Sequence, residues 1–133
     1  MLSPNSASND RRSVLLIGLA PEAVDYAKFP GLDAERLAAG LEAALAAVVA
    51  AGFDASWCLT ERDAAAAEAA ISARLAERGY DAVMIGAGVR AVPENLELFE
   101  RIVNLVHAAA PGARICFNTS PDTTLAAVRR WLP

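Results

Sequence analysis

The sequence predicts a single α/β domain whose core is a four-stranded parallel sheet with helices on both faces. Three observations lead to this prediction. Apolar runs of strand length alternate with longer segments of helical periodicity, which is the pattern of repeated strand–helix units. Two of these runs are apolar throughout, as in strands that are buried on both faces. The chain has 133 residues, of which 55% are hydrophobic and 21% charged, enough for one buried core.

The first twelve residues are polar and show no periodicity, so we expect residues 1–12 to form a disordered tail and 13–133 to form the domain. Short apolar runs that end in glycine, proline or polar residues indicate strands. The predicted strands are Val14–Leu19, Phe53–Leu59, Ala82–Gly86 and Ala113–Asn118.

Helices are predicted between the strands from apolar residues spaced three and four apart, such as Leu37, Leu41, Leu45 and Val48. Gly52 follows the first of these helices, where a C-terminal glycine commonly lies. The predicted helices are Asp33–Ala51, Asp63–Arg78, Pro93–Ala110 and Asp122–Leu132.

The strand order follows from which strands are apolar on both faces. Strands 14–19 and 82–86 are apolar throughout and should be central, whereas strand 53–59 alternates and should lie at an edge. This favours a three-layer sandwich with order 2-1-3-4, a truncated flavodoxin-like fold, over order 3-2-1-4. Strand 113–118 is then an open edge, which suggests a homodimer through this strand or the last helix. The alternative is that the last helix shields the edge.

Composition excludes several classes of function. The net charge of −4 and the lack of a basic cluster argue against nucleic-acid binding. Two cysteines and one histidine cannot supply a structural zinc site, and we expect neither a metal nor a cofactor. Arg11–Arg12 and the apolar run after them could pass for a signal peptide, but a strand explains the run better. No run is long enough to span a membrane, so we expect a cytoplasmic protein without membrane partners.

A ligand site is expected where the strand order reverses, between the first and third strands. The long loop Gly18–Leu32 and the segment Gly86–Asn95 should meet there, beside Asn118–Asp122. Glycines in the second segment allow conformations closed to other residues, and Arg90 offers a charged fork for phosphate or carboxylate. We therefore predict a site for an anionic small molecule. Its candidate residues are Gly18, Asp25, Tyr26, Gly86, Gly88, Arg90, Glu94, Asn118, Thr119 and Ser120.

Purely structural roles compete with this hypothesis. Arg90 could pair with Glu94 or Asp25, and Thr119 and Ser120 could serve only to cap the last helix. For Asp122 the capping role is the favoured interpretation.

Motifs that would indicate a specific activity are incomplete or absent. Gly86–Ala91 fits a loose dinucleotide fingerprint, but Pro93 delays the helix and Asn118 stands where an acidic residue is expected. The chain has no P-loop, no acidic residues where a receiver domain needs them, and no flavodoxin phosphate loop. His107 falls on the polar side of its helix and is expected at the surface. Cys58 has no histidine positioned to activate it, so a nucleophilic role is improbable.

Three segments cover most of the chain after residue 12: VLLIGLAPEAVDYAKFPGL, YDAVMIGAGVRAVPENLELFERIVNLVHAAAPGARICFN and TSPDTTLAAVRRWL. In these segments the chain resembles a family of short bacterial proteins described only as hypothetical proteins, with a Rossmann-like or flavodoxin-like α/β fold. The resemblance implies that fold and supplies no activity, substrate, cofactor or catalytic residue.

Three functions follow as hypotheses. The first is a module that binds an anionic small molecule at the carboxyl edge of the sheet. The second is an enzyme acting on a phosphorylated or carboxylate metabolite, with Arg90 for orientation and Asp25, Glu94 or Tyr26 for proton transfer. The third is a dimeric interaction protein without a ligand.

Overall fold

The four predicted strands form one sheet in which every neighbouring pair is parallel, in the order β2-β1-β3-β4. This confirms the predicted topology. The computed structural model describes residues 11–133. Each strand lies within about one residue of its predicted bounds. The strands are β1 (Ser13–Leu19), β2 (Asp54–Thr60), β3 (Ala82–Ile85) and β4 (Arg114–Phe117).

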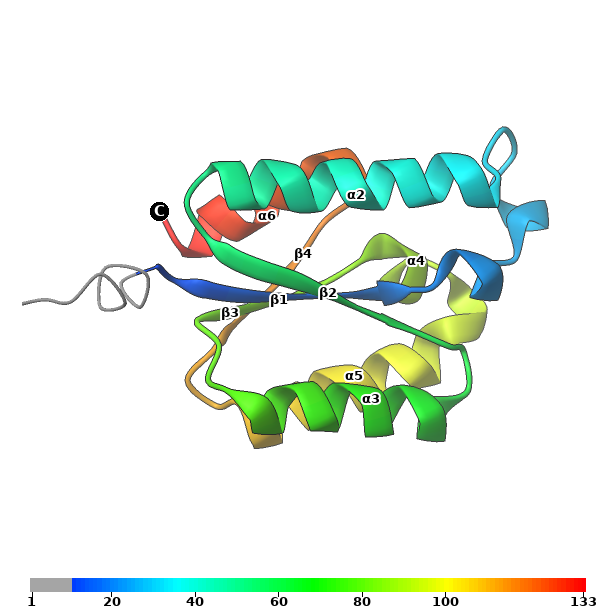
Figure 1. Cartoon of the computed structure of the whole chain (residues 1–133). Coiled ribbons are helices and arrows are strands. Elements are labelled where there is room, and N and C mark those ends of the chain that lie inside the picture. The colour runs from blue at the N-terminus through cyan, green and yellow to red at the C-terminus, as the bar shows by residue number, and fades with distance from the viewer. Residues whose placement is uncertain (1–10) are drawn as a thin grey trace, which may run out of the picture.

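Helices cover both faces of the sheet, so the domain has three layers (Figure 1). Helices α2 and α6 lie on one face, and α3 and α5 on the other. The main helices are α2 (Ala34–Ala50), α3 (Ala64–Glu77), α5 (Leu96–Ala109) and α6 (Thr124–Trp131). Short helical turns precede α2, α5 and α6: η1 (Pro21–Ala23), η2 (Tyr26–Lys28), α4 (Ala87–Arg90), η3 (Pro93–Asn95) and η4 (Pro121–Thr123).

Local signals explain where the helices begin. The Asp33 carboxylate accepts a hydrogen bond from the Arg36 N–H at 2.8 Å, and Asp63 accepts one from the Ala66 N–H at 2.9 Å. Both aspartates therefore cap the N-termini of α2 and α3. Gly52, with a φ of 100°, ends the turn after α2 in a conformation that favours glycine.

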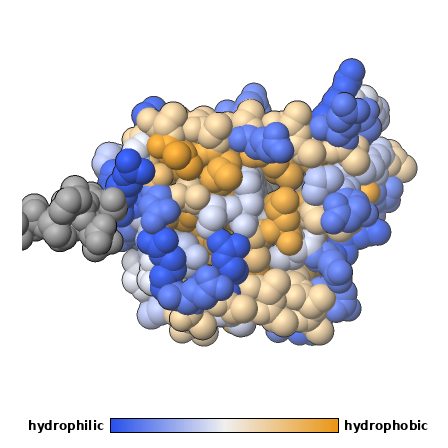
Figure 2. All heavy atoms as spheres, in the orientation of Figure 1, coloured by the Kyte–Doolittle hydropathy of each residue, from blue (hydrophilic) through white to orange (hydrophobic). Residues whose placement is uncertain are grey.

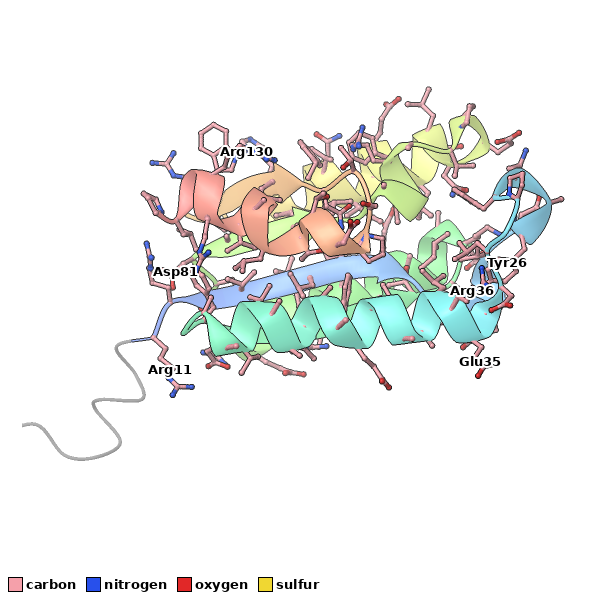
Figure 3. All side chains as sticks on the ribbon, turned by 90° about the horizontal axis from the view of Figure 1, so that it is seen from above. Arg11, Tyr26, Glu35, Arg36, Asp81 and Arg130 are labelled. Carbon is pink, nitrogen blue, oxygen red and sulfur yellow. The ribbon has the colours of Figure 1, made fainter. Side chains whose placement is uncertain are left out.

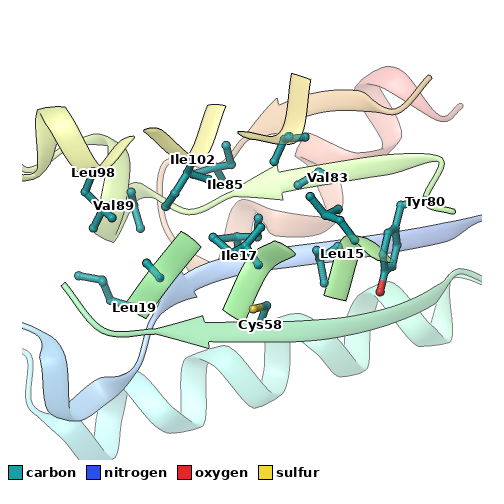
Figure 4. Packing of buried hydrophobic residues seen from close by; sticks show 14 residues of the cluster. Leu15, Ile17, Leu19, Cys58, Tyr80, Val83, Ile85, Val89, Leu98 and Ile102 are labelled. Atoms are coloured by element: carbon teal, nitrogen blue, oxygen red, sulfur yellow. The ribbon is translucent and has the colours of Figure 1, made fainter. Parts of the chain in front are cut away.

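The central strands are buried on both faces, as predicted for strands flanked by two helical layers. In β1, Leu15, Ile17 and Leu19 face α3 and α5, while Val14 and Leu16 face α2 and α6. Figure 4 shows the first of these two clusters, in which Ile71 and Ile102 from the covering helices are fully buried.

The edge strand β2 lies where it is predicted, and its burial alternates near its carboxyl end. Cys58 and Thr60 are buried, whereas Leu59 is 39% exposed. The reason is that α3 covers the side of β2 that carries Cys58. Figure 2, in the orientation of Figure 1, shows small hydrophobic areas on this face of the molecule; the exposed large hydrophobic residues of α2 and β2 are Val49 and Leu59.

Arginines occupy both open edges of the sheet. Arg74 donates a hydrogen bond to the Trp57 carbonyl of β2 at 2.9 Å, and Arg130 donates one to the Phe117 carbonyl of β4 at 2.9 Å. A charged side chain that occupies an edge carbonyl opposes the addition of another strand. Pairing through β4 would require Arg130 to release that carbonyl.

Of the predicted tail, residues 1–12, the first ten residues lie outside the part of the chain that the structure describes. Its last residue, Arg12, contacts the other end of the chain: its guanidinium donates to the carbonyls of Leu132 and Pro133 at 3.2 and 2.9 Å.

Within residues 11–133, no helix is both long enough and apolar enough to cross a membrane.

Candidate functional site

The segments that follow β1, β3 and β4 meet at the carboxyl edge of the sheet. The Gly86 N–H donates to the Ile17 carbonyl at 2.8 Å, and the Ala87 N–H donates to the Asn118 side-chain oxygen at 2.9 Å. These bonds place the turn after β3 between the ends of β1 and β4. Figure 3 shows that Tyr26 and Arg36 lie at this end of the molecule, opposite Arg11 and Asp81.

A pocket of about 310 Å³ opens at this edge, where the strand order reverses. Its position agrees with the general location of ligand sites in open parallel sheets. Every residue that lines it is uncharged. The lining consists of Gly18, Leu19, Val24, Phe29, Leu32, Leu37, Leu41, Trp57, Gly86, Ala87, Gly88, Asn118, Thr119, Ser120 and Pro121.

Large apolar side chains make up one wall of the pocket. Phe29 and Leu32 come from the loop after β1, and Leu41 comes from α2. The Trp57 indole N–H donates to the Leu41 carbonyl at 2.9 Å, which fixes the ring. A Cβ at Gly18 would lie 3.2 Å from that ring, so glycine at this position lets the indole pack over the end of β1.

The opposite wall carries short polar groups that are already bonded within the protein. The buried Asn118 amide accepts from Ala87 and donates to the Thr124 hydroxyl at 3.0 Å. The N–H groups of Thr119 and Ser120 donate to the Thr123 hydroxyl at 3.0 and 3.2 Å. This wall is therefore rigid, and little of its bonding capacity is left for a ligand.

The structure confirms Ser120 as a capping residue of the last helical segment, but not Asp122, for which that role was the favoured interpretation. Ser120 occupies the N-cap position of η4, whereas Asp122 lies within the first turn and accepts a hydrogen bond from the Ser120 hydroxyl. Pro121 at the first helical position moves the start of the turn one residue earlier than expected, because proline suits that position.

Arg90 does not line the pocket. Its guanidinium donates to the Asn118 carbonyl at 3.0 Å and lies over the Phe117 ring, 5.9 Å from the ring centre. Its Nε atom is buried without a partner. Neither of the two structural pairings expected for Arg90, with Glu94 or with Asp25, is present, because Arg90 turns toward the end of β4.

The remaining candidates lie beside the pocket rather than in it. Tyr26 donates its hydroxyl to the Pro21 carbonyl at 2.6 Å, and desolvation raises the pKa of this phenol, with smaller contributions from Asp33 and Glu22. Asp25 accepts from the Ala27 N–H at 3.2 Å. Glu94 forms an ion pair with Lys28 at 2.6 Å.

The expectation that Gly86 and Gly88 use conformations closed to other residues is wrong. Gly86 has an ordinary φ of −74°, and among the described residues a positive φ occurs at Gly31 and Gly52 alone. Gly86 is needed for space instead, since its Cβ would lie 3.3 Å from the Ile17 carbonyl oxygen. A Cβ at Gly88 would meet nothing within 4 Å, so this glycine faces open space.

A small hollow of about 10 Å³ adjoins the pocket and shares part of its lining, namely Leu19, Val24, Phe29 and Gly88. The rest of its lining consists of three charged residues, Asp25, Lys28 and Arg62, and two uncharged ones, Val92 and Asn95.

Sequence reasoning missed the apolar wall and the charges of the adjoining hollow. Leu37 and Leu41 were assigned to a buried helical face without a cavity beside them, and Arg62 was not singled out. The signal that could have found the wall is Phe29 and Leu32, two large apolar residues in a long loop where solvent exposure would favour polar ones.

The two cysteines and the histidine are not in the lining of the pocket. Burial raises the pKa of the Cys58 thiol, and it raises the pKa of Cys116 to about 11. His107 is exposed on α5, as predicted. Residues 11–133 contain no group of three or more histidine, cysteine or acidic side chains that could hold a metal ion.

A wider hollow of about 550 Å³ lies between α3 and α5, and it shares no lining residue with the pocket at the strand ends. Arg101 occupies it and pairs with Glu97 at 3.0 Å and with Glu68 at 3.2 Å. These are exposed ion pairs on a solvated face, and we assign no function to them.

No protein-family model matches this chain, and no curated protein matches it. The resemblance to a family of short bacterial proteins therefore stays an expectation from the sequence.

Proposed function

We propose that this protein binds a small, largely apolar molecule in the pocket between the ends of β1 and β3. The single observation that carries the proposal is the pocket's lining: Phe29, Leu41 and Trp57 form an apolar wall at the edge where ligands bind in this class of fold. A volume of about 310 Å³ is within the range of small-molecule sites.

Binding is favoured over catalysis because the groups that could transfer protons are engaged outside the pocket. Tyr26 is bonded to Pro21, and Glu94 is paired with Lys28. The raised pKa of Cys58 keeps its thiol protonated at neutral pH. An enzyme acting on a phosphorylated or carboxylate metabolite is the alternative, and turnover of a bound compound would establish it.

A thermal-shift panel of neutral aromatics, aliphatic alcohols, carboxylates, sugar phosphates and nucleotides tests the proposal. A binder at one hundred times its dissociation constant adds about 2.7 kcal/mol to the free energy of unfolding. We expect stabilisation by compounds with apolar bodies and none by nucleotides. The opposite pattern would contradict the proposal.

Gly88→Leu provides a variant that fills the pocket without disturbing the fold. Gly88 lines the pocket, its Cβ position is open, and its φ is not positive. We expect this variant to fold and to lose the stabilisation by ligand. Gly79→Leu is the matched control, since its Cβ position is also open but lies outside the pocket lining. Equal stabilisation of both variants would refute the site.

A homodimer through β4 or α6 is a second candidate for how the protein acts. The observation that favours it is Trp131, which is 51% exposed at the end of α6. Light scattering at tens of micromolar protein tests it. A dimeric mass that Trp131→Ala converts to a monomeric mass is the expected result, and a monomeric mass for the unaltered chain would exclude it.

We also propose a cytoplasmic location. Cys58 and Cys116 are both buried and free, which suits a reducing compartment. Cell fractionation of the tagged protein tests this, and recovery in a secreted fraction would contradict it.

A further inference from the structure

We propose that the ligand is an amphipathic monocarboxylate whose apolar body occupies the pocket and whose carboxylate lies in the adjoining hollow between Lys28 and Arg62. This inference rests on the proposed function, because it names the ligand class of the same site. It also places the anionic group of the ligand away from Arg90, the residue expected from the sequence to bind it, because Arg90 faces the end of β4.

The two cavities are continuous in their lining. Leu19, Val24, Phe29 and Gly88 border both of them. We infer that a ligand whose chain lies along the apolar wall reaches the hollow past these shared residues. The hollow, at about 10 Å³, has room for about one water-sized group, so only an oxygen of the head group can enter it and the body of the ligand must remain in the larger pocket.

The charged side chains that line the hollow are two cations and one carboxylate, so the lining carries a net positive charge. Lys28 and Arg62 supply two positive charges, which lie near enough to influence each other electrostatically. Arg62 forms no salt bridge within residues 11–133, whereas Lys28 is held by Glu94 at 2.6 Å. Asp25 also borders the hollow, and its carboxylate accepts from the Ala27 N–H.

Glu94 therefore acts as the resident carboxylate partner of Lys28 when no ligand is bound. Its side chain is exposed and comes from a different segment, η3, so it can leave without unpacking the core. A ligand carboxylate that binds Lys28 must compete with Glu94, and it gains Arg62 as a second cation. A single carboxylate suits this arrangement better than a phosphate, because Asp25 and Glu94 already place two negative charges nearby.

Three eight-carbon probes with one shared tail separate the head group from the apolar body: sodium octanoate, 1-octanol and octylamine. The Trp131→Phe protein leaves Trp57 in the pocket wall as the single tryptophan, so its fluorescence reports binding. We expect octanoate to bind most tightly and octylamine most weakly.

Substitutions in the hollow should then act on octanoate alone. Arg62→Gln should weaken octanoate binding about five- to tenfold, the range for one charge-assisted contact near the surface. Glu94→Gln should strengthen it about threefold by releasing Lys28. Both variants should bind 1-octanol within about twofold of the unaltered protein. Arg114→Gln, at the other end of β4, makes the same change of charge far from the hollow and serves as the control.

Each other outcome overturns the inference. Equal binding of octanoate and 1-octanol, with no effect of Arg62→Gln, would remove the head-group site and leave the apolar pocket of the proposed function standing. Fluorescence that responds to neither compound would reject the amphipathic class. The pocket itself is then judged by the thermal-shift panel and the Gly88→Leu variant, which do not depend on octanoate.

Discussion

Replacing Asn118 by alanine removes the side chain that links the turn after β3 to the start of α6. Its amide accepts from the Ala87 N–H at 2.9 Å and donates to the Thr124 hydroxyl at 3.0 Å, and the residue is only 4% exposed. A typical hydrogen bond contributes about 0.5–1.5 kcal/mol, so two bonds contribute about 1–3 kcal/mol. The Ala87 N–H is left without its partner in the variant, which favours the upper half of that range.

We therefore expect Asn118→Ala to lower the free energy of unfolding by about 2–3 kcal/mol. Urea unfolding followed by far-UV circular dichroism measures this, and Thr119→Ala is the control. Thr119 is exposed and its hydroxyl contacts only the Thr123 hydroxyl, so its loss should stay within about 0.5 kcal/mol.

A double-mutant cycle with Thr124→Val isolates the bond between the two side chains, with an expected coupling of about 1 kcal/mol. A loss below about 0.5 kcal/mol for Asn118→Ala would refute the account of how these segments are held together.

Three other predictions concern the core and the site. Ile71→Ala should lower the free energy of unfolding by about 2–5 kcal/mol in the same urea assay, because Ile71 is fully buried under the sheet; a smaller loss would mean that α3 collapses onto the gap. The raised pKa of Cys116, about 11, predicts that a thiol reagent modifies Cys58 and Cys116 far more slowly in the folded protein at pH 8 than in urea, and equal rates would contradict the burial. Trp131→Phe should shift the mean fluorescence emission to shorter wavelength, because it removes the more exposed indole and leaves Trp57; a shift to longer wavelength would mean that Trp57 is the more solvated.

The strand order was predictable because it depends on local composition. Val14–Ile17 and Ala82–Ile85 are apolar at every position, and only a strand covered on both faces can bury such a run. The alternation in β2 identified the edge correctly, since an edge strand can leave one residue such as Leu59 exposed. It could not show which face α3 covers, because that depends on how the helix packs.

The helix α4 was not predictable from local sequence. Glycines at 86 and 88 lower helix propensity, and the short Ala87–Arg90 turn forms because Asn118 accepts from Ala87 and Val89 is fully buried. Both interactions come from tertiary packing. The placement of Arg90 also depends on Asn118, because the Arg90 guanidinium donates to the Asn118 carbonyl, 28 residues away in the chain.

The pocket was predictable in position but not in character. The reversal of strand order located it, and Gly18, Gly86 and Asn118 are indeed in its lining. Its apolar wall depends on the packing of α2 against β2, which brings the Leu41 carbonyl close enough to accept the Trp57 indole N–H. No single segment of the sequence carries that information.

Backbone amide chemical shifts, recorded while the tightest compound of the thermal-shift panel is added, locate the bound molecule directly. We expect the largest changes at Gly18, Gly88 and Ser120, with a dissociation constant that agrees between the three amides. Changes centred instead on Glu97 and Asn104, in the hollow between α3 and α5, would place the ligand outside the pocket and contradict the assignment of the site.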